Sequence, residues 1–251
     1  MATPAETTSQ RTADAAAVGA AVAGAAGAAG AGAAADTTPA LRDLVVERIQ
    51  LDERSWVDVC RGWVQHPDEV ERALVETTPW NQGRIFRYDR WVDEPRLGSA
   101  WRPGRPVPHP VLVDAHRALR HHYGVPFEGF ALALYRDGRD SVAFHRDREM
   151  RWLEDTLIGV LTFGAKRPWL LRPRANRYDH EAPNRGAVVD LAPASGDLIV
   201  MGGRAQTDWE HAVPKVPELR RPRVSLQWRW TSRRGRPEVG ANYRAPRFYD
   251  R

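Results

Sequence analysis

The sequence predicts a mostly β fold with flanking helices, of the sandwich or jelly-roll type. After Gly124 the chain consists of short apolar runs of strand length, separated by turn residues such as Asp137-Gly138 and Gly202-Gly203. Before Gly124, two segments have helical periodicity. Many short strands at this spacing are typical of packed antiparallel sheets rather than of a doubly wound parallel sheet.

The individual elements can be placed in order along the chain. Helices are expected at residues 54–64 and 110–123, and the second ends at Gly124, ahead of Pro126. Between them, residues 84–101 are rich in aromatic and basic side chains. Strands are expected at residues 130–135, 156–163, 169–172, 187–191, 197–201 and 224–230. The Arg-rich stretch after Ser232 is expected to be irregular.

The first 40 or so residues differ from the rest in composition. They are dominated by Ala, Gly and Thr, so they cannot bury enough surface to offset the cost of ordering. Residues 15–35 are uncharged, but Ala and Gly with two Val are too weakly apolar for a membrane span of ~20 residues. Asp14 and a lone Arg11 also fit a secretion signal poorly. We therefore predict a disordered tail, residues 1–40, followed by a single domain, residues 41–251.

Charge divides at the same boundary. The tail contains Arg11 against Glu6, Asp14 and Asp36, a net charge of −2. Because the whole chain carries +5, the remainder carries +7. A basic surface suits a phosphate-bearing partner such as nucleic acid. A generally Arg-rich composition explains the same excess, so charge alone does not decide between these interpretations.

Cys60 is the single cysteine of the chain. One cysteine excludes a disulfide, a cysteine-based zinc site and an iron–sulfur cluster within one chain. Any metal site must therefore use histidine and carboxylate ligands. Cys60 lies in the apolar-patterned residues 56–64 and is expected in the core.

A candidate metal motif is formed by His145-Arg146-Asp147. On an extended strand, positions i and i+2 share one face ~6.6 Å apart, so an imidazole and a carboxylate can converge on one ion. A second histidine would complete the 2-His-1-carboxylate triad, which leaves positions open for other ligands. Alone, the motif is equally compatible with a structural histidine.

Three later residues strengthen the metal interpretation. His211 lies just beyond the strand expected at residues 197–201, and Arg223 and Arg229 lie in an apolar run. On a strand, both arginines point to the side opposite Val224 and Trp228. Two guanidiniums on one buried face require an anion, and a dicarboxylate is a suitable partner. The alternative is a solvated basic face that contacts phosphate.

These segments resemble AlkB-like dioxygenases, most closely the animal DNA-repair branch of that family. The resemblance rests on residues 134–149, which contain His145 and Asp147, on residues 206–215, which contain His211, and on the spacing of Arg223 and Arg229. The motifs agree in order and spacing from residue 145 to 229, and a looser resemblance covers residues 84–229.

The resemblance implies a double-stranded β-helix, which is a form of the jelly roll, with Fe(II) at its open end. It divides the domain into a helical and nucleotide-recognition part, about residues 41–128, and a β core, about residues 129–232. The residues it implies as iron ligands are His145, Asp147 and His211. The cosubstrate would be 2-oxoglutarate, with Arg229 at the carboxylate nearer the metal, and Arg223 and Tyr135 at the distal carboxylate.

Two positions depart from the family pattern. The family often has Asn where this chain has Ala133 and Ser225. Both changes remove polar contacts to the cosubstrate, so they bear on the affinity for 2-oxoglutarate and leave the metal ligands intact.

The activity that the resemblance implies is oxidative dealkylation of N-alkylated bases in DNA, such as N1-methyladenine and N3-methylcytosine. It would consume O₂ and 2-oxoglutarate and release formaldehyde, succinate and CO₂. Glu149 occupies the position of a carboxylate that reads the exocyclic amine. The target base must leave the duplex and stack in a pocket. Candidate stacking residues are Tyr88, Trp91 and Trp101, although a tryptophan is more often a core residue.

Several alternatives stay open at this point. The same chemistry could act on RNA, protein or lipid, because fold does not fix substrate. A non-catalytic nucleic-acid-binding module and a zinc hydrolase are further alternatives, which the intact ligand set and the two arginines disfavour. We expect a cytoplasmic monomer without a membrane partner. The candidate phosphate contacts are Arg172, Arg174, Arg204, Arg233, Arg234 and Arg236.

Overall fold

The structure is a computed structural model that describes residues 37–87, 89–147, 150–174 and 188–238. Backbone contacts divide the chain into residues 1–36 and residues 37–251. The predicted tail lies outside the described residues up to residue 36. Strand β1 (Ala40–Leu41) pairs with β4 (Val64–Gln65), so described structure begins slightly before the boundary expected at residue 41.

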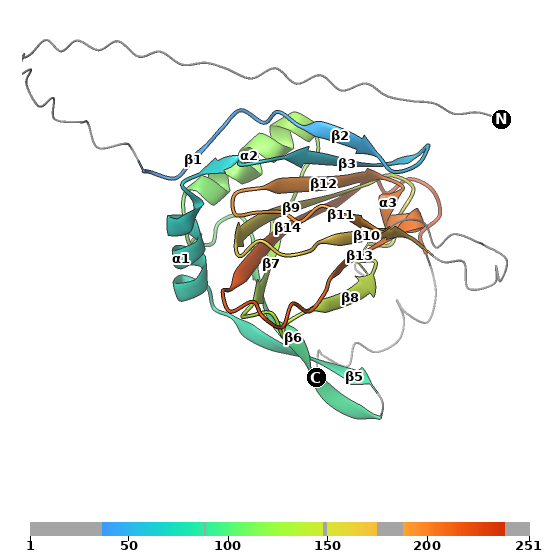
Figure 1. Cartoon of the computed structure of the whole chain (residues 1–251). Helices are drawn as coiled ribbons and strands as arrows, with labels where there is room; N and C mark the ends of the chain where they lie inside the picture. The colour runs from blue at the N-terminus through green and yellow to red at the C-terminus, as the bar shows by residue number, and fades with distance from the viewer. Residues whose placement is uncertain (1–36, 88, 148–149, 175–187, 239–251) are drawn as a thin grey trace, which may run out of the picture. The chain divides into compact units, whose positions relative to one another are not determined.

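Two antiparallel sheets form the body of residues 37–238 (Figure 1). The larger sheet contains, in spatial order, β2 (Glu47–Gln50), β3 (Ser55–Cys60), β12 (Leu198–Gly203), β9 (Thr156–Gly164), β14 (Arg223–Thr231), β7 (Phe130–Tyr135), β6 (Arg90–Trp101) and β5 (Asn81–Arg87). The smaller sheet contains β11 (Val189–Asp190), β10 (Leu170–Pro173), β13 (Trp209–Val213) and β8 (Val142–His145). This arrangement confirms the predicted mostly β, jelly-roll fold.

The two faces of the larger sheet bury different cores. One face packs against helices α1 (Pro67–Thr77) and α2 (Val111–Tyr123), through residues such as Leu74 and Leu119. The other face packs against the smaller sheet, where Ile158 and Val160 join Leu171 and Val213. Side chains of a strand alternate between faces, so each central strand contributes to both cores. Tyr135, which was singled out in the sequence, lies on the face that looks toward the smaller sheet.

Strand β14 illustrates this alternation and confirms the pattern expected from the sequence. Val224, Leu226 and Trp228 are fully buried in the core under the helices. The intervening residues, beginning with Arg223, therefore point toward the smaller sheet. Because β14 pairs with β7 on one side and β9 on the other, this face is held on both edges.

The helix expected at residues 54–64 is wrong, because this segment forms β3 and a turn at Gly62. Both faces of β3 are covered, so its apolar residues do not alternate clearly, and a short buried run cannot be assigned by periodicity alone. Cys60 is buried as expected. The helix at residues 110–123 is confirmed by α2, which ends at Gly124 with φ +64°.

Helix α1 was not expected from the sequence. Its start carries two ordinary signals, Pro67 in the first turn and the acidic residues Asp68 and Glu69 beside the positive end of the helix. It buries Val70 and Leu74 against the larger sheet. Each segment expected to be a strand contains one in the structure, although residue 187 lies outside the described residues.

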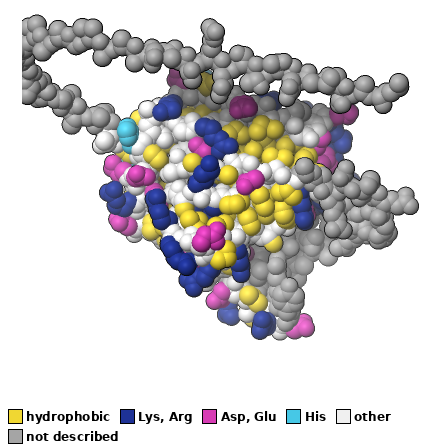
Figure 2. Space-filling view, viewed as in Figure 1, with side chains coloured by type: hydrophobic (Ala, Val, Ile, Leu, Met, Phe, Trp, Pro, Cys, Tyr) yellow, Lys and Arg dark blue, Asp and Glu magenta, His cyan; other side chains and the backbone are white. Residues whose placement is uncertain are grey.

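The aromatic and basic residues 84–101 belong to the hairpin of β5 and β6, which projects from one end of the body (Figure 1). Lys and Arg side chains gather on the lower part of the visible face, where this hairpin projects (Figure 2). Among the described residues, the helices are too short or too polar to cross a bilayer.

Candidate metal centre and cosubstrate site

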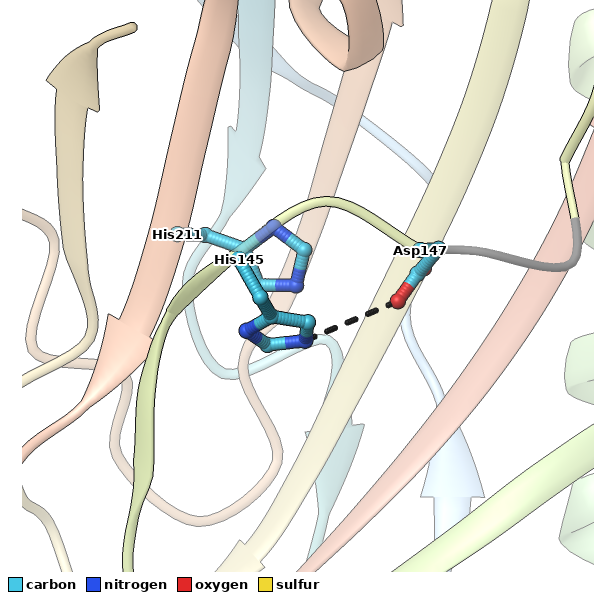
Figure 3. Close-up of side chains that lie close together, drawn as sticks. All are labelled: His145, Asp147 and His211. Atoms are coloured by element: carbon cyan, nitrogen blue, oxygen red, sulfur yellow. Dashed lines mark ion pairs between the residues drawn. The ribbon is translucent and has the colours of Figure 1, made fainter. Parts of the chain in front are cut away.

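His145 and His211 are direct partners across two strands of the smaller sheet. His145 ends β8, His211 lies in the middle of β13, and the two residues are paired in register. Their ring centroids are 4.3 Å apart (Figure 3). The sequence placed His211 beyond a strand, whereas it lies on a strand of its own. Cross-strand pairing on one face explains why residues 66 positions apart in the sequence meet.

Asp147 reaches the same point from a loop. The spacing of His145 and Asp147 is compatible with one extended strand, but β8 ends at His145, and the amide of Met150 donates to the Asp147 carbonyl at 3.3 Å. Asp147 Oδ1 still lies 3.7 Å from His145 Nε2 (Figure 3). One ligand atom from each of His145, Asp147 and His211 lies within 4.8 Å of the others. Two imidazoles and one carboxylate match the donor set of a mononuclear iron site.

The surroundings of both histidines favour metal binding. His145 Nδ1 lies 2.8 Å from the Ala143 carbonyl, which can only accept a hydrogen bond, so Nδ1 donates to it and Nε2 is the ring nitrogen available to a metal. His211 stacks on Trp169, with ring centroids 5.4 Å apart. Burial, reinforced by the neighbouring His145, lowers the pKa of His211 to about 3, so its ring is neutral at neutral pH.

Asp147 is held in place from two sides. Arg229 Nε donates to Asp147 Oδ2 at 2.8 Å, and Gln206 Nε2 donates to the Asp147 backbone carbonyl at 3.1 Å. Burial alone would raise the pKa of the Asp147 carboxyl, but the charge and hydrogen bond of Arg229, together with His211 and His145, hold this pKa below its usual range. The carboxylate is therefore ionised, with Oδ2 occupied by Arg229 and Oδ1 facing His145.

Arg223 supplies the strongest sign of an anionic ligand. It lies opposite Tyr135 in the β14–β7 register and is 0% exposed. Its Nη2 donates to Thr162 Oγ1 at 3.0 Å, while Nε and Nη1 have no hydrogen-bond partner among the described residues. Burial lowers the pKa of Arg223 to about 10. A buried guanidinium with two open donors fits a carboxylate, such as the distal carboxylate of 2-oxoglutarate.

Tyr135 lies among several cations. The guanidinium carbons of Arg223 and Arg167 lie 5.5 and 5.2 Å from its ring centroid. Burial alone would lower the pKa of Arg96, on β6, but its interactions with Tyr135, Glu94 and Asp147 raise this pKa. Arg96 and Arg167 were not singled out in the sequence, because their roles depend on strands that meet only in the fold.

The two departures from the family pattern face each other. Ser225 and Ala133 are register partners across β14 and β7. Gln227 Nε2 donates to Ser225 Oγ at 3.3 Å, and Gln227 Oε1 accepts from Arg229 Nη2 at 2.7 Å. A polar chain therefore runs along this face of β14 from Ser225 to Asp147, and Gln227 and Arg229 are its middle members.

The candidate base-stacking residues separate into two groups. Trp101 is 8% exposed, stacks on Phe130 at 4.9 Å, and donates from Nε1 to the Arg105 carbonyl at 2.8 Å, so it is a core residue and its proposed role in base stacking is wrong. Trp91 lies on the projecting hairpin, edge-on to Phe86 at 5.7 Å, and Phe86 is 42% exposed. Tyr88 and Glu149 lie outside the described residues.

The candidate phosphate contacts also differ in their surroundings. Arg172 donates to Glu210 at 2.8 Å, and Arg204 donates to Glu154 and to Asp208 at 2.6 and 3.1 Å. These two arginines are therefore neutralised by carboxylates in the structure. The remaining candidates are exposed, namely Arg174, Arg233, Arg234 and Arg236.

The family profile of the 2OG-Fe(II) oxygenase superfamily matches residues 64–229. The chain therefore belongs to this superfamily, and Fe(II) and 2-oxoglutarate are the cofactor and cosubstrate that the triad and Arg223 fit.

Two individual proteins are also similar to this chain in sequence. Alpha-ketoglutarate-dependent dioxygenase alkB homolog 3 of Bos taurus is 31% identical over 189 residues, which cover 70% of this chain and 66% of that protein. DNA oxidative demethylase ALKBH2 of Homo sapiens is 33% identical over 178 residues, covering 64% of this chain and 67% of that protein. The chain thus spans just under two thirds of the first relative. A solved prolyl hydroxylase from Trichoplax adhaerens superposes with a TM-score of 0.48 and 12% identity, over 68% of this chain and 82% of that one.

Proposed function

We propose that this protein oxidatively removes alkyl groups from the bases of DNA, with N1-methyladenine and N3-methylcytosine as substrates. The observation that carries the proposal is the convergence of His145, Asp147 and His211 beside a buried Arg223 with open donors. The substrate class is supported by the two relatives, of which one is named a DNA oxidative demethylase. The intact set of ligands and arginines argues against a non-catalytic module, and the open donors of Arg223 argue against a zinc hydrolase.

The metal centre would be held by His145 Nε2, Asp147 Oδ1 and His211. When bound, Fe(II) with 2-oxoglutarate and O₂ supplies the oxidising chemistry, in which 2-oxoglutarate becomes succinate and CO₂ and the N-alkyl carbon becomes hydroxylated. The hydroxylated carbon, attached to a ring nitrogen, breaks down to formaldehyde and the unmodified base. The protein's own residues orient the reactants and exclude water.

Each arginine has a distinct part in this orientation. Arg223 would pair with the distal carboxylate of 2-oxoglutarate, and the Tyr135 hydroxyl would donate to the same group. Arg229 is bonded through Nε and Nη2 to Asp147 and Gln227, so its first task is to fix the ligand carboxylate. Its contact with the carboxylate nearer the metal stays a prediction.

The β5–β6 hairpin would contact the nucleic acid. Its exposed Phe86 and the adjacent Trp91 offer aromatic surface on a projecting element with Arg84 and Arg90 nearby in sequence. An alkylated base must be extruded before its alkyl carbon can reach the metal, and aromatic side chains stabilise an unstacked base. Glu149 stays the predicted reader of the exocyclic amine.

The test is formaldehyde release from oligonucleotides containing N1-methyladenine or N3-methylcytosine, single-stranded, double-stranded and as RNA, with Fe(II), ascorbate and 2-oxoglutarate. We expect release from at least one DNA substrate and none from a His145→Ala protein. Release confined to RNA would replace DNA as the substrate. Consumption of 2-oxoglutarate without formaldehyde from any oligonucleotide would retain the oxygenase chemistry and overturn the nucleic-acid substrate.

A further inference from the structure

Arg167 is a buried arginine that has no part in the mechanism described above. It lies between β9 and β10 and is 2% exposed. Nη1 donates to the Asp137 carbonyl at 3.1 Å, and Nη2 donates to the carbonyls of Asp140 and Pro214 at 2.7 and 2.6 Å. The carboxylates of Asp137 and Asp140 bond to other arginines. Arg167 is therefore a buried cation held by carbonyl groups; burial lowers its pKa, although Tyr135, Asp140 and Asp137 partly offset this effect.

The three carbonyls belong to two segments that border the cosubstrate site. Asp137 and Asp140 lie in the loop that follows Tyr135, and Pro214 follows directly after β13, the strand of His211. The segments also meet through Gly138, where an added Cβ would lie 1.6 Å from the Val216 carbonyl oxygen. Arg167 thus ties the loop behind Tyr135 to the end of β13 at a point of close backbone approach.

Arg167 also changes the electrostatics around Tyr135. Its guanidinium lies 5.2 Å from the Tyr135 ring centroid, and Arg223 lies 5.5 Å from the same ring. The pKa of Arg223 is lowered by burial and further by the charge of Arg167. Two buried guanidiniums that repel each other beside one tyrosine create a positive potential, and an anion that binds Arg223 relieves the repulsion as well.

We propose that Arg167 is a positioning residue for the distal carboxylate of 2-oxoglutarate. It acts without touching the cosubstrate, through the fixed placement of Tyr135 and through its charge beside Arg223. The inference rests on the Fe(II) and 2-oxoglutarate chemistry of the superfamily. It does not depend on the nucleic-acid substrate, so it can fail or succeed independently of that proposal.

A comparison of two 2-oxo acids isolates the distal carboxylate. 2-Oxoglutarate and 2-oxobutyrate share the end that chelates the metal, but 2-oxobutyrate lacks the second carboxylate. The affinity of each acid is measured on the anaerobic Fe(II) protein through its visible charge-transfer absorption. For Arg167→Met we expect the dissociation constant of 2-oxoglutarate to rise by about tenfold or more, in the range of a lost charge-assisted interaction, and that of 2-oxobutyrate to change less than about twofold.

Two further variants keep this test decisive. Arg167→Lys retains the charge, and we expect it to recover 2-oxoglutarate affinity to within about threefold of the wild type. Arg220→Met serves as the control, because Arg220 is an exposed arginine that donates to the Pro217 carbonyl at 2.6 Å in the next loop. If Arg167→Met does not fold, Arg167→Gln, which keeps a donor without the charge, takes its place.

Unchanged affinity for 2-oxoglutarate in the neutral variant would overturn the proposal. So would an equal loss for both acids, which would mean general damage to the site, or a selective loss in Arg220→Met. A loss confined to 2-oxoglutarate, absent from the control and reversed by lysine, would support it.

Discussion

Without cosubstrate, the Arg223→Met protein should be more stable than the wild type. With 2-oxoglutarate present, it should be less stable than the wild type. Arg223 is 0% exposed, and two of its nitrogens have no partner among the described residues. A buried unsatisfied donor costs ~1–3 kcal/mol, whereas the bond to Thr162 contributes ~1 kcal/mol. The pKa of Arg223, lowered by burial to about 10, independently points to a penalty of roughly 3 kcal/mol on the charged form.

These values predict that Arg223→Met raises the free energy of unfolding by about 2 kcal/mol, because methionine fills similar space without a charge. In a protein of this size, that gain corresponds to a rise in Tm of roughly 4–8 °C. The wild type should instead be stabilised by 2-oxoglutarate, by ~2.7 kcal/mol at a concentration of 100 times Kd, and the variant should lose this effect.

The assay is thermal unfolding of both proteins under anaerobic Fe(II), with and without 2-oxoglutarate, and Arg220→Met as the exposed-arginine control. The stability order of wild type and variant should invert on addition of the cosubstrate. A variant that is less stable than the wild type without cosubstrate would refute the reasoning, because it would mean that Arg223 is already compensated in the folded protein. A variant that 2-oxoglutarate stabilises as strongly as it does the wild type would refute the assigned carboxylate contact.

Four other changes have distinct expected outcomes. Trp91→Ala should lower the rate of formaldehyde release and change the free energy of unfolding by no more than about 0.5 kcal/mol, whereas Trp101→Ala should lower that free energy by ~3–5 kcal/mol because it empties a core site. Chemical denaturation and a turnover assay distinguish the two variants. A stable, fully active Trp91→Ala protein would contradict the proposed role of the hairpin. Glu238→Gln breaks a partly exposed ion pair with Arg146, 3.1 Å long, so it should lower the free energy of unfolding by no more than ~1 kcal/mol and the Fe(II) affinity by less than about fivefold. A tenfold loss of metal affinity would show instead that Glu238 fixes the position of the segment that carries Asp147. Burial raises the pKa of Glu71 in spite of the charge of Arg221, so the folded state favours the protonated carboxyl. The stability that Glu71 contributes is therefore present below its unfolded pKa of about 4.5 and is lost as the pH rises through the folded pKa. Glu71→Gln should therefore gain stability relative to the wild type as pH rises from 4 to 8, and a difference in unfolding free energy that stays flat or falls over this range would contradict that assignment.

The sequence predicts most about a strand whose two faces differ, because the alternation then gives the direction of each side chain as well. In β14, apolar and polar residues alternate, so the alternation by itself places Arg223 on the face opposite Trp228. In β3 both faces are buried and the pattern disappears, which is why a helix was expected there. Asp147 was considered on a strand because its spacing from His145 fits one, but β8 ends at His145, and no local pattern in the sequence marks that end.

The grouping of His145, Asp147 and His211 could be predicted because their motifs keep a fixed order and spacing. Arg96 and Arg167 could not, because each reaches Tyr135 from a strand or turn distant in sequence, and arginine is common along this chain. Trp101 was misassigned for the opposite reason, since a tryptophan beside an aromatic and basic segment gives no local sign of which way its ring will point.

The pairing of His145 with His211 makes metal binding depend on the register of strand β8. Strand β8 is the outermost strand of the smaller sheet, and the β8–β13 ladder is irregular just beyond this pair. A slip of one residue would turn one imidazole to the opposite face of the sheet. Chains with a misaligned outer strand would then be unable to chelate iron, and their unpaired edge would be free to recruit other chains. Iron bound to both imidazoles would therefore stabilise the correct register of this edge strand.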